Sequence, residues 1–246
     1  MKRLSWQVRA AIILIILSVL LYMIFFAVFK DANLMFMYLL AGLAFLPIEI
    51  LLVTFILNKL LTEREKRILL EKMNMVIGVF FSEIGTKLII YFSDFDPELD
   101  KIKKDLIVTD SWSEKKFNDV SLKLKSYDYV IESKKIDLKK LKTFLKEKRN
   151  FSIRLLENPN LLEHESFTEL LRALFHLTEE LESRDSMENL PENDYKHLNG
   201  DIKRVYVLLV HQWLDYMKYL KNNYPYLFSL AMRTNPFDKT ASPYIK

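Results

Sequence analysis

The feature that most constrains the fold of this chain is a pair of long apolar runs near its N-terminus. Residues 10–29 contain no charged side chain, and residues 34–57 contain a single one, Glu49. The hydrocarbon core of a bilayer is about 30 Å thick, and a helix of about 20 residues crosses it. Residues 30–33, between the runs, leave room only for a tight turn. The sequence therefore predicts an antiparallel transmembrane hairpin.

The charges that flank the two runs predict how the hairpin is oriented. A cleaved signal peptide is the alternative for the first run, but this run is longer than the usual apolar region of a signal peptide and no small-residue cleavage pattern follows it. Basic residues flank the cytoplasmic ends of spans, and here they are Lys2, Arg3 and Arg9 before the first run and Lys59, Arg64, Lys66 and Arg67 after the second. The turn carries only Lys30. We expect a multi-pass protein of the plasma membrane, with the N-terminus and the C-terminal domain in the cytoplasm.

Three parts follow from this pattern. Residues 1–61 form the transmembrane hairpin, with spans at about 10–29 and 34–57; residues 62–92 form an amphipathic juxtamembrane helix; residues 93–246 form a cytoplasmic helical domain. Residues 73–92 are apolar enough to resemble a third span. However, Glu83 and Lys87 share one side of the helical wheel, and charges inside a span are costly. We interpret residues 73–92 as a helix that lies in the membrane interface or packs on the soluble domain.

The region after residue 93 has the signals of helices separated by short breaks. Asp96, Ser111, Asp137 and Ser166 stand at predicted helix starts, and Asn158-Pro159-Asn160 and Tyr224-Pro225 at breaks. Residues 120–124 also alternate between apolar and polar, so a short strand is an alternative there. Residues 194–223 carry one apolar stripe that is typical of a core face: Ile202, Val205, Tyr206, Leu209, Trp213, Tyr216, Met217 and Leu220. We predict an all-α fold, a two-helix transmembrane hairpin followed by a cytoplasmic helical bundle domain, with an extended tail after Arg233.

The composition offers little material for catalysis. The chain has no cysteine and four glycines, and it contains no phosphate loop, nucleophile elbow, HExxH or dinucleotide fingerprint. We expect no enzyme activity and no cofactor. The net charge of +4 is small and no recognition motif accompanies the lysines, so we expect no nucleic-acid partner. Glu163, His164 and His176 are the first candidates for metal ligands, although His176 lies on the polar side of its helix, whereas bundle metal sites use ligands that point inward.

Glu49 is the residue of the hairpin with the most chemical interest, because an ionisable side chain inside a span is a functional hypothesis. Counted from the cytoplasmic ends of the two spans, Ser18 reaches a similar depth, and Tyr22 lies one turn deeper on the same face. A protonated Glu49 bonded to Ser18 or Tyr22 would hold the hairpin together. Passage of ions or protons through an oligomer and snorkelling of Glu49 toward the headgroups are the alternatives.

Asn235-Pro236-Phe237 in the tail matches the short ligand of eukaryotic endocytic adaptor domains. Tripeptides recur by chance and nothing else in the chain indicates vesicle traffic. We interpret the tripeptide as a packing or turn element.

Three stretches carry a resemblance to a known family: Met73–Glu83 (MNMVIGVFFSE), Glu157–Leu181 (ENPNLLEHESFTELLRALFHLTEEL) and Tyr224–Phe237 (YPYLFSLAMRTNPF). Together with the leading hairpin they resemble a family of uncharacterised bacterial and archaeal integral membrane proteins with an N-terminal two-span hairpin. The resemblance covers most of the chain and implies a prokaryotic plasma membrane. These motifs have no assigned chemistry, so the resemblance implies no site residue.

The sequence is compatible with three functions. The first is a non-enzymatic, membrane-anchored interaction or signalling module, whose partners are the lipid bilayer, a cytoplasmic protein and, through the hairpin, further copies of the chain. The second is a small oligomeric channel or transport subunit that uses Glu49. The third is a metal protein or enzyme at the membrane surface.

Overall fold

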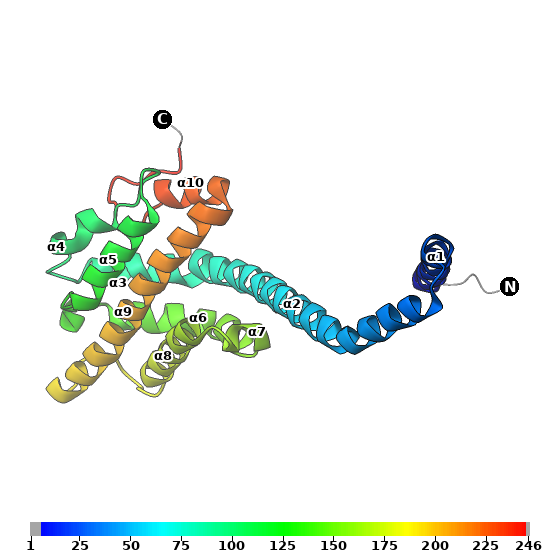
Figure 1. The fold of residues 1–246 in the computed structure, drawn as a ribbon. Coiled ribbons are helices and arrows are strands. Elements are labelled where there is room, and N and C mark those ends of the chain that lie inside the picture. Colours follow the sequence, from blue (N-terminus) through cyan, green and yellow to red (C-terminus); the bar gives the residue numbers. More distant parts are fainter. Residues whose placement is uncertain (1–5, 245–246) are drawn as a thin grey trace. The chain divides into compact units, whose positions relative to one another are not determined.

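The chain folds into helices, as the sequence predicts. The computed structural model describes residues 6–244, and Lys2 and Arg3, which support the predicted orientation, lie outside the described residues. The helices are α1 (Trp6–Phe29), α2 (Ala32–Phe80), α3 (Thr86–Ser93), α4 (Asp100–Lys103), α5 (Glu114–Ser126), α6 (Leu138–Leu156), α7 (Pro159–Leu162), α8 (Glu165–Glu182), α9 (Glu192–Asn223) and α10 (Pro225–Arg233) (Figure 1). A π-helical turn, Phe81–Gly85, joins α2 to α3, and short 3-10 turns cover Lys104–Leu106 and Ser133–Lys135. No strand occurs within residues 6–244, so the all-α prediction is confirmed.

The chain divides into two compact units, residues 1–66 and 67–246. The first unit contains α1 and the first part of α2, and the turn between them is built by two residues. Lys30 has a φ of 50°, in the left-handed region, and the Asp31 carboxylate accepts hydrogen bonds from the backbone N–H groups of Asn33 and Leu34 at 2.9 and 3.1 Å. Asp31 therefore satisfies the first free donors of α2 and fixes where this helix begins.

Both helices of the first unit are long and apolar enough to cross a membrane, and none of their apolar windows is buried. Near the turn, the Phe25 ring meets the Tyr38 ring edge-on at 5.9 Å. Pro47 lies inside α2, where it lacks the N–H that would bond to the preceding turn.

The second unit is a helical bundle around the segment from Met73 to Phe92. Six side chains of this segment are at most 1% exposed: Ile77, Phe80, Ile84, Leu88, Ile89 and Phe92. The Phe80 ring meets Phe167 of α8 edge-on at 5.2 Å, and the Phe81 ring stacks on Tyr216 of α9 at 5.3 Å. Residues 73–92 thus form the central helix of this bundle. Of the two interpretations of this segment, the structure agrees with the one in which it packs on the helical domain.

Helix α9 organises the other side of the bundle. It packs on α8, α5, α3 and α10, while α6 packs on α8 (Figure 1). The predicted stripe faces the core, since seven of its eight members are buried and Tyr216 is partly buried. Two glycines of the central segment leave room for aromatic side chains, one from α9 and one from the segment itself. A Cβ on Gly78 would lie 2.6 Å from the Tyr216 hydroxyl, and one on Gly85 would lie 2.6 Å from the Phe81 ring.

Some of the observed helix starts agree with those predicted from the sequence. Asp137 accepts from the Lys140 N–H at 2.8 Å and caps α6, as predicted. Ser113, rather than Ser111, caps α5 by accepting from the Lys116 N–H. The predicted strand alternative at residues 120–124 is wrong because these residues lie within α5, where Val120 and Leu124 are buried one turn apart.

Two other predicted starts need correction. The His164 ring nitrogen, rather than the Ser166 hydroxyl, caps α8 by accepting from the Phe167 N–H. Asp96 accepts from the Glu98 N–H at 3.0 Å, but the residues after it form a turn and α4 begins only at Asp100.

The tail after Arg233 is folded rather than extended. The Asn235 side chain donates to the Leu106 carbonyl at 2.9 Å and accepts from the Phe237 N–H at 2.9 Å. The Phe237 ring lies edge-on against Trp213 at 5.0 Å, and both Asn235 and Phe237 are 2% exposed. The interpretation of Asn235-Pro236-Phe237 as a packing element is confirmed, because buried side chains are not available to an adaptor domain.

Candidate functional site

The three predicted metal candidates do not come together. Glu163 is exposed at the end of α7 and His164 is the cap of α8. His164 accepts through Nδ1, and burial lowers the pKa of its imidazole, so this nitrogen is committed to the helix start. His176 lies twelve residues further along α8, about 18 Å at the rise of an α-helix. The structure therefore separates His176 from the other two candidates.

His176 instead lies in a cluster that joins α8 to α9. Its Nε2 atom is 3.7 Å from Oδ2 of Asp201, and the Nε2 atom of His197 is 3.4 Å from the same oxygen. One ligand atom each from His176, His197 and Asp201 lie within 4.8 Å of one another. Glu180 adds a second carboxylate, 3.9 Å from His176 and 3.4 Å from His197. Imidazoles and carboxylates in this arrangement have the donor set of a divalent metal site.

Arg184 fixes the carboxylates beside this cluster. It donates to Glu180 at 2.9 Å and binds Asp194 at 2.8 and 2.7 Å with its Nε and Nη2 atoms. The hydrogen bond from Arg184 lowers the pKa of both carboxyl groups, so both are charged at neutral pH. An open surface cavity of about 520 Å³ adjoins His176 and Glu180. The cluster is thus negatively charged and accessible from solvent.

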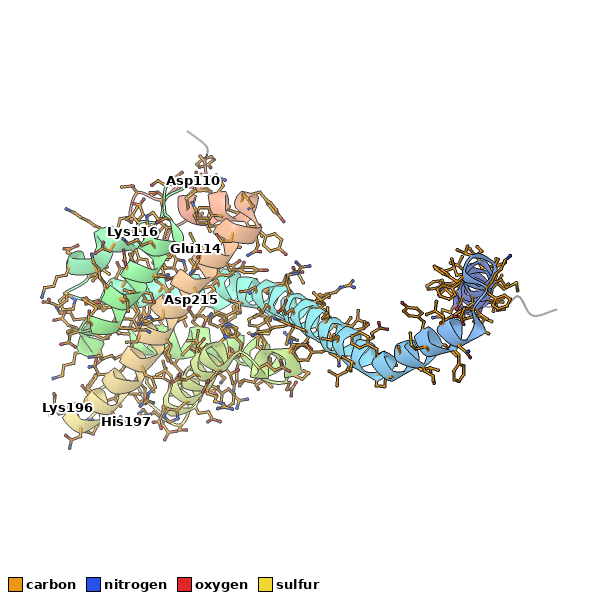
Figure 2. All side chains as sticks on the ribbon, viewed as in Figure 1. Asp110, Glu114, Lys116, Lys196, His197 and Asp215 are labelled. Atoms are coloured by element: carbon orange, nitrogen blue, oxygen red, sulfur yellow. The ribbon has the colours of Figure 1, made fainter. Side chains whose placement is uncertain are left out.

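His197 and Asp201 are the members of the cluster that the sequence interpretation missed. His197 lies near the start of α9 (Figure 2). The signal in the sequence is a pair of like-spaced motifs, His176-x-x-x-Glu180 and His197-x-x-x-Asp201, each of which puts its two side chains on one helix face. One motif alone is common on a polar helix face, and only the packing of α8 on α9 brings the two together.

A second buried carboxylate, Asp96, lies among tyrosines. Its two oxygens accept from the Tyr127 hydroxyl at 3.1 and 3.0 Å, and the Tyr127, Tyr129 and Tyr206 rings meet edge-on at 4.6 and 5.5 Å. The hydroxyls of Tyr129 and Tyr206 are buried without a hydrogen-bond partner in the described residues. Burial raises the pKa of Asp96 to about 6, and the Tyr127 hydrogen bond opposes this shift.

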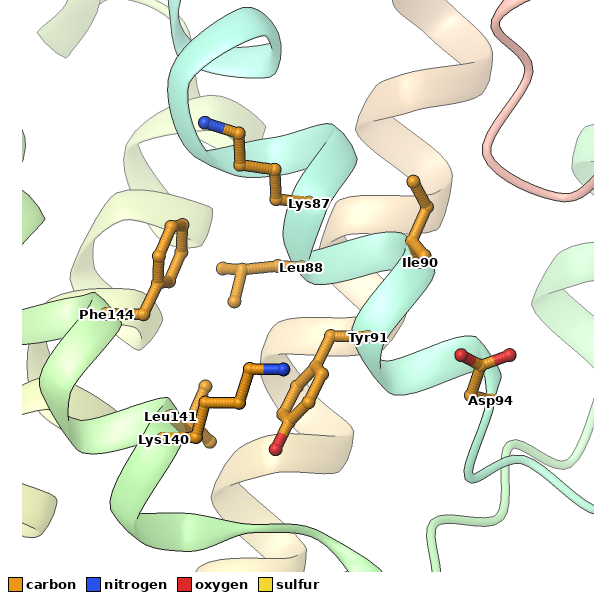
Figure 3. A pocket seen from close by; sticks show the side chains of 8 residues that line it. All are labelled: Lys87, Leu88, Ile90, Tyr91, Asp94, Lys140, Leu141 and Phe144. Atoms are coloured by element: carbon orange, nitrogen blue, oxygen red, sulfur yellow. The ribbon is translucent and has the colours of Figure 1, made fainter. Parts of the chain in front are cut away.

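An amphipathic cavity of about 370 Å³ lies between α3 and α6. Its apolar side includes Leu88 and Phe144, and Lys140 lies over the Tyr91 ring with 5.6 Å between its Nζ atom and the ring centre (Figure 3). The Tyr91 hydroxyl is directed away from the cavity and donates to the Asp137 carbonyl at 2.9 Å. Tyr91 therefore serves mainly to join α3 to the start of α6.

A groove of about 540 Å³ lies between the central helix, α9 and α10, and several exposed apolar side chains border it. Tyr216, Tyr219, Tyr224 and Tyr226 line it together with Met75, Val79, Leu227 and Leu230. Met75 is 61% exposed and Tyr226 is 71% exposed. This tyrosine groove, defined by these eight residues, is an apolar surface that has no cover in the described part of the chain.

The polar residues predicted inside the first unit lie on its surface. Glu49, Ser18 and Tyr22 are exposed, and no hydrogen bond joins Glu49 to Ser18 or Tyr22 within residues 6–244. The bonded pair and the channel role of Glu49 both stay predictions.

Comparison with known proteins places the chain in a family. A family model described as "Uncharacterized protein MJ1433, C-terminal helical domain" matches residues 69–233, and "MJ1433, N-terminal helical domain" matches residues 2–61. Uncharacterized protein MJ1433 of the archaeon Methanocaldococcus jannaschii is 49% identical over 228 residues, which are 93% of this chain and 92% of that protein. No solved structure matches the chain. With matches to both helical domains and an archaeal relative of nearly equal length, the chain belongs to the MJ1433 family.

Proposed function

We propose that this protein is an integral membrane protein in which residues 1–61 anchor a cytoplasmic helical domain at the plasma membrane. The main support for this proposal is that the apolar windows of α1 and α2 are wholly exposed. Leu14, Leu51 and Phe55 are each more than 60% exposed. Soluble monomers rarely leave contiguous apolar surfaces of this size in water. The hydrocarbon core of a bilayer covers such surfaces, and a helix can cross it because its backbone groups are hydrogen-bonded within the helix.

The distribution of charge supports one orientation. Arg9 precedes the first apolar run, and Lys59, Arg64, Lys66 and Arg67 follow the second, while the turn carries Lys30 beside Asp31. The excess of basic residues thus flanks the ends of the runs away from the turn. The proposed topology has the turn outside and both long flanks in the cytoplasm.

The absence of cysteine from the sequence makes a single-cysteine topology experiment clean. With Ala32→Cys in the turn, we expect a membrane-impermeant maleimide to label intact cells. With Lys115→Cys on α5, we expect labelling only after permeabilisation. Both positions are exposed, so the two variants differ in compartment rather than in burial. The unmodified chain is the control for background labelling.

Two results contradict the proposed transmembrane hairpin. One is recovery of the protein in the soluble fraction after cell lysis without detergent. The other is an Ala32→Cys variant that, like Lys115→Cys, is labelled only in permeabilised cells. The reverse pattern, with Lys115→Cys labelled from outside, retains a membrane protein but overturns the orientation.

We further propose that the helical domain is an interaction module that binds a cytoplasmic protein through the tyrosine groove. Support comes from chemistry, since tyrosine and methionine are enriched in protein interfaces and lysine and glutamate are depleted. None of the eight groove residues is charged. An apolar protein surface is the partner that such a groove recognises.

Replacement of Tyr226 by glutamate is expected to weaken partner binding about 10-fold or more, because it puts a charge into an apolar interface. The measurement is quantitative co-purification of one identified protein after cross-linking in intact membranes. Tyr244→Glu is the matched control, since Tyr244 is also an exposed tyrosine but lies outside the groove. Equal recovery of the same protein with both variants would exclude the groove as the binding surface.

A further inference from the structure

Asp201 has an unexplained feature at the cluster between α8 and α9. This residue is 4% exposed, and its Oδ1 atom accepts from Arg204 at 3.2 Å. Its Oδ2 atom is buried and has no hydrogen-bond partner in the described residues. Buried carboxylate oxygens are normally paired, and one that is left unpaired is destabilising. The position of Oδ2 therefore calls for a ligand.

Two imidazole nitrogens face this oxygen, and both are farther from it than a direct hydrogen bond would place them. The Nε2 atoms of His197 and His176 are 3.4 and 3.7 Å from Oδ2. A direct N–H···O bond would bring the atoms to about 2.7–3.2 Å. Ligand atoms at tetrahedral positions around zinc, each about 2.0–2.2 Å from the ion, lie about 3.3 Å apart. The observed separations are close to the edges of such a tetrahedron.

Glu180 provides a fourth group at the same place. Its Oε2 atom is 3.4 Å from His197 Nε2, and its Oε1 atom is 3.9 Å from His176 Nε2. Arg184 holds the Glu180 carboxylate with a hydrogen bond of 2.9 Å. A basic residue bound to a ligating carboxylate orients it, as outer-shell partners do in metal sites.

We propose that His176, His197 and Asp201 bind one Zn²⁺ ion, with Glu180 at the fourth position. Two imidazoles and two carboxylates are ligands that zinc accepts in tetrahedral geometry, whereas magnesium and calcium prefer oxygen ligands alone. The ion would link α8 to α9, because each helix provides one histidine and one carboxylate. The ligand pairs are spaced i and i+4 on both helices, which places each pair on one face.

The test is zinc binding by the full-length chain, purified in detergent with a tag that contains no histidine. After dialysis against a weak chelator, we expect one zinc ion per chain by elemental analysis and a zinc-dependent rise in the unfolding temperature. Co²⁺ in place of zinc should give the visible absorption of a tetrahedral site. His176→Ala and His197→Ala should each weaken zinc binding at least about 100-fold, the upper end of what loss of an outer-shell partner causes.

His211→Ala is the matched control, because His211 also lies on α9 but outside the cluster. The side chains of both ligand histidines are about half exposed, so their replacement by alanine should leave the fold intact, which circular dichroism checks. Wild-type protein that retains no zinc overturns the proposal and leaves the histidines as ion-pair partners of Asp201. Equal loss of zinc in His211→Ala and His197→Ala also overturns it.

Discussion

Replacement of Phe80 by alanine is expected to lower the free energy of unfolding of the helical domain by about 3–5 kcal/mol, the usual range for loss of a buried phenylalanine. The Phe80 side chain is fully buried at the centre of the bundle, where its ring meets those of Phe81 and Phe167. Alanine would leave a cavity on the central helix that α8 cannot fill without moving. Because α8 also packs on α9, a movement of α8 into the cavity would weaken the packing between α8 and α9 as well.

Thermal unfolding of the detergent-purified chain, followed by tryptophan fluorescence, measures this effect. Trp112 and Trp213 are both buried in the domain and report on its packing. For a domain of this size, the expected decrease in unfolding temperature is about 10 °C. Val79→Ala is the control, because Val79 precedes Phe80 on the same helix but is half exposed. If both variants unfold at the wild-type temperature, the central role assigned to residues 73–92 is wrong.

The second large effect concerns pH and Asp96. Burial raises the pKa of this carboxyl from 3.8 to about 6, so the folded state binds the proton more tightly than the unfolded state. Below pH 3.8 both states are protonated and Asp96 has no effect on stability. As the pH rises toward 6 the unfolded state releases its proton first, and the folded state loses stability. Above pH 6 the whole penalty is present, at most about 3 kcal/mol.

Asp96→Asn is expected to remove this penalty while keeping an oxygen that accepts from Tyr127 and from the Glu98 N–H. The free energy of unfolding of the variant, minus that of the wild type, should therefore increase between about pH 4 and pH 7 and stay level above it. Taking the difference cancels the other titrating groups. A flat difference for Asp96→Asn would mean that its carboxyl is not desolvated in the folded state.

The sequence could predict those parts of the fold that depend on one helix at a time. The apolar stripe of residues 194–223 defined α9 within two residues, and Asp137 marked the start of α6 because its side chain bonds to the backbone three residues later. The capping residue is harder to predict where two residues close in sequence could each cap the same helix. His164 and Ser166 both offer an acceptor near the start of α8, and the Ser166 hydroxyl donates instead to Gln212 of α9. That choice depends on packing between helices.

Of the three proposed zinc ligands His176, His197 and Asp201, the sequence analysis identified only His176. A helical wheel puts His176 on the polar face of α8, and this placement is correct, but a wheel has no information about which helix lies opposite that face. His197 and Asp201 become partners of His176 only through the packing of α8 on α9. Likewise, the sequence of residues 73–92 fits a membrane interface or a protein core, since both cover the same apolar side chains. Contacts with α8 and α9 distinguish the two.

The hydrogen bond between Asn235 and Leu106 has a consequence for synthesis, because these residues are 129 positions apart. A ribosome adds roughly 5–20 residues per second, so about 10 s pass between the emergence of the two residues. For the first part of this interval the apolar faces of α2 and α3 have been made, but α9, which packs on α3 and stacks Tyr216 on Phe81, has not. Folding of the domain therefore finishes late, and those faces stay uncovered until the later helices have been made.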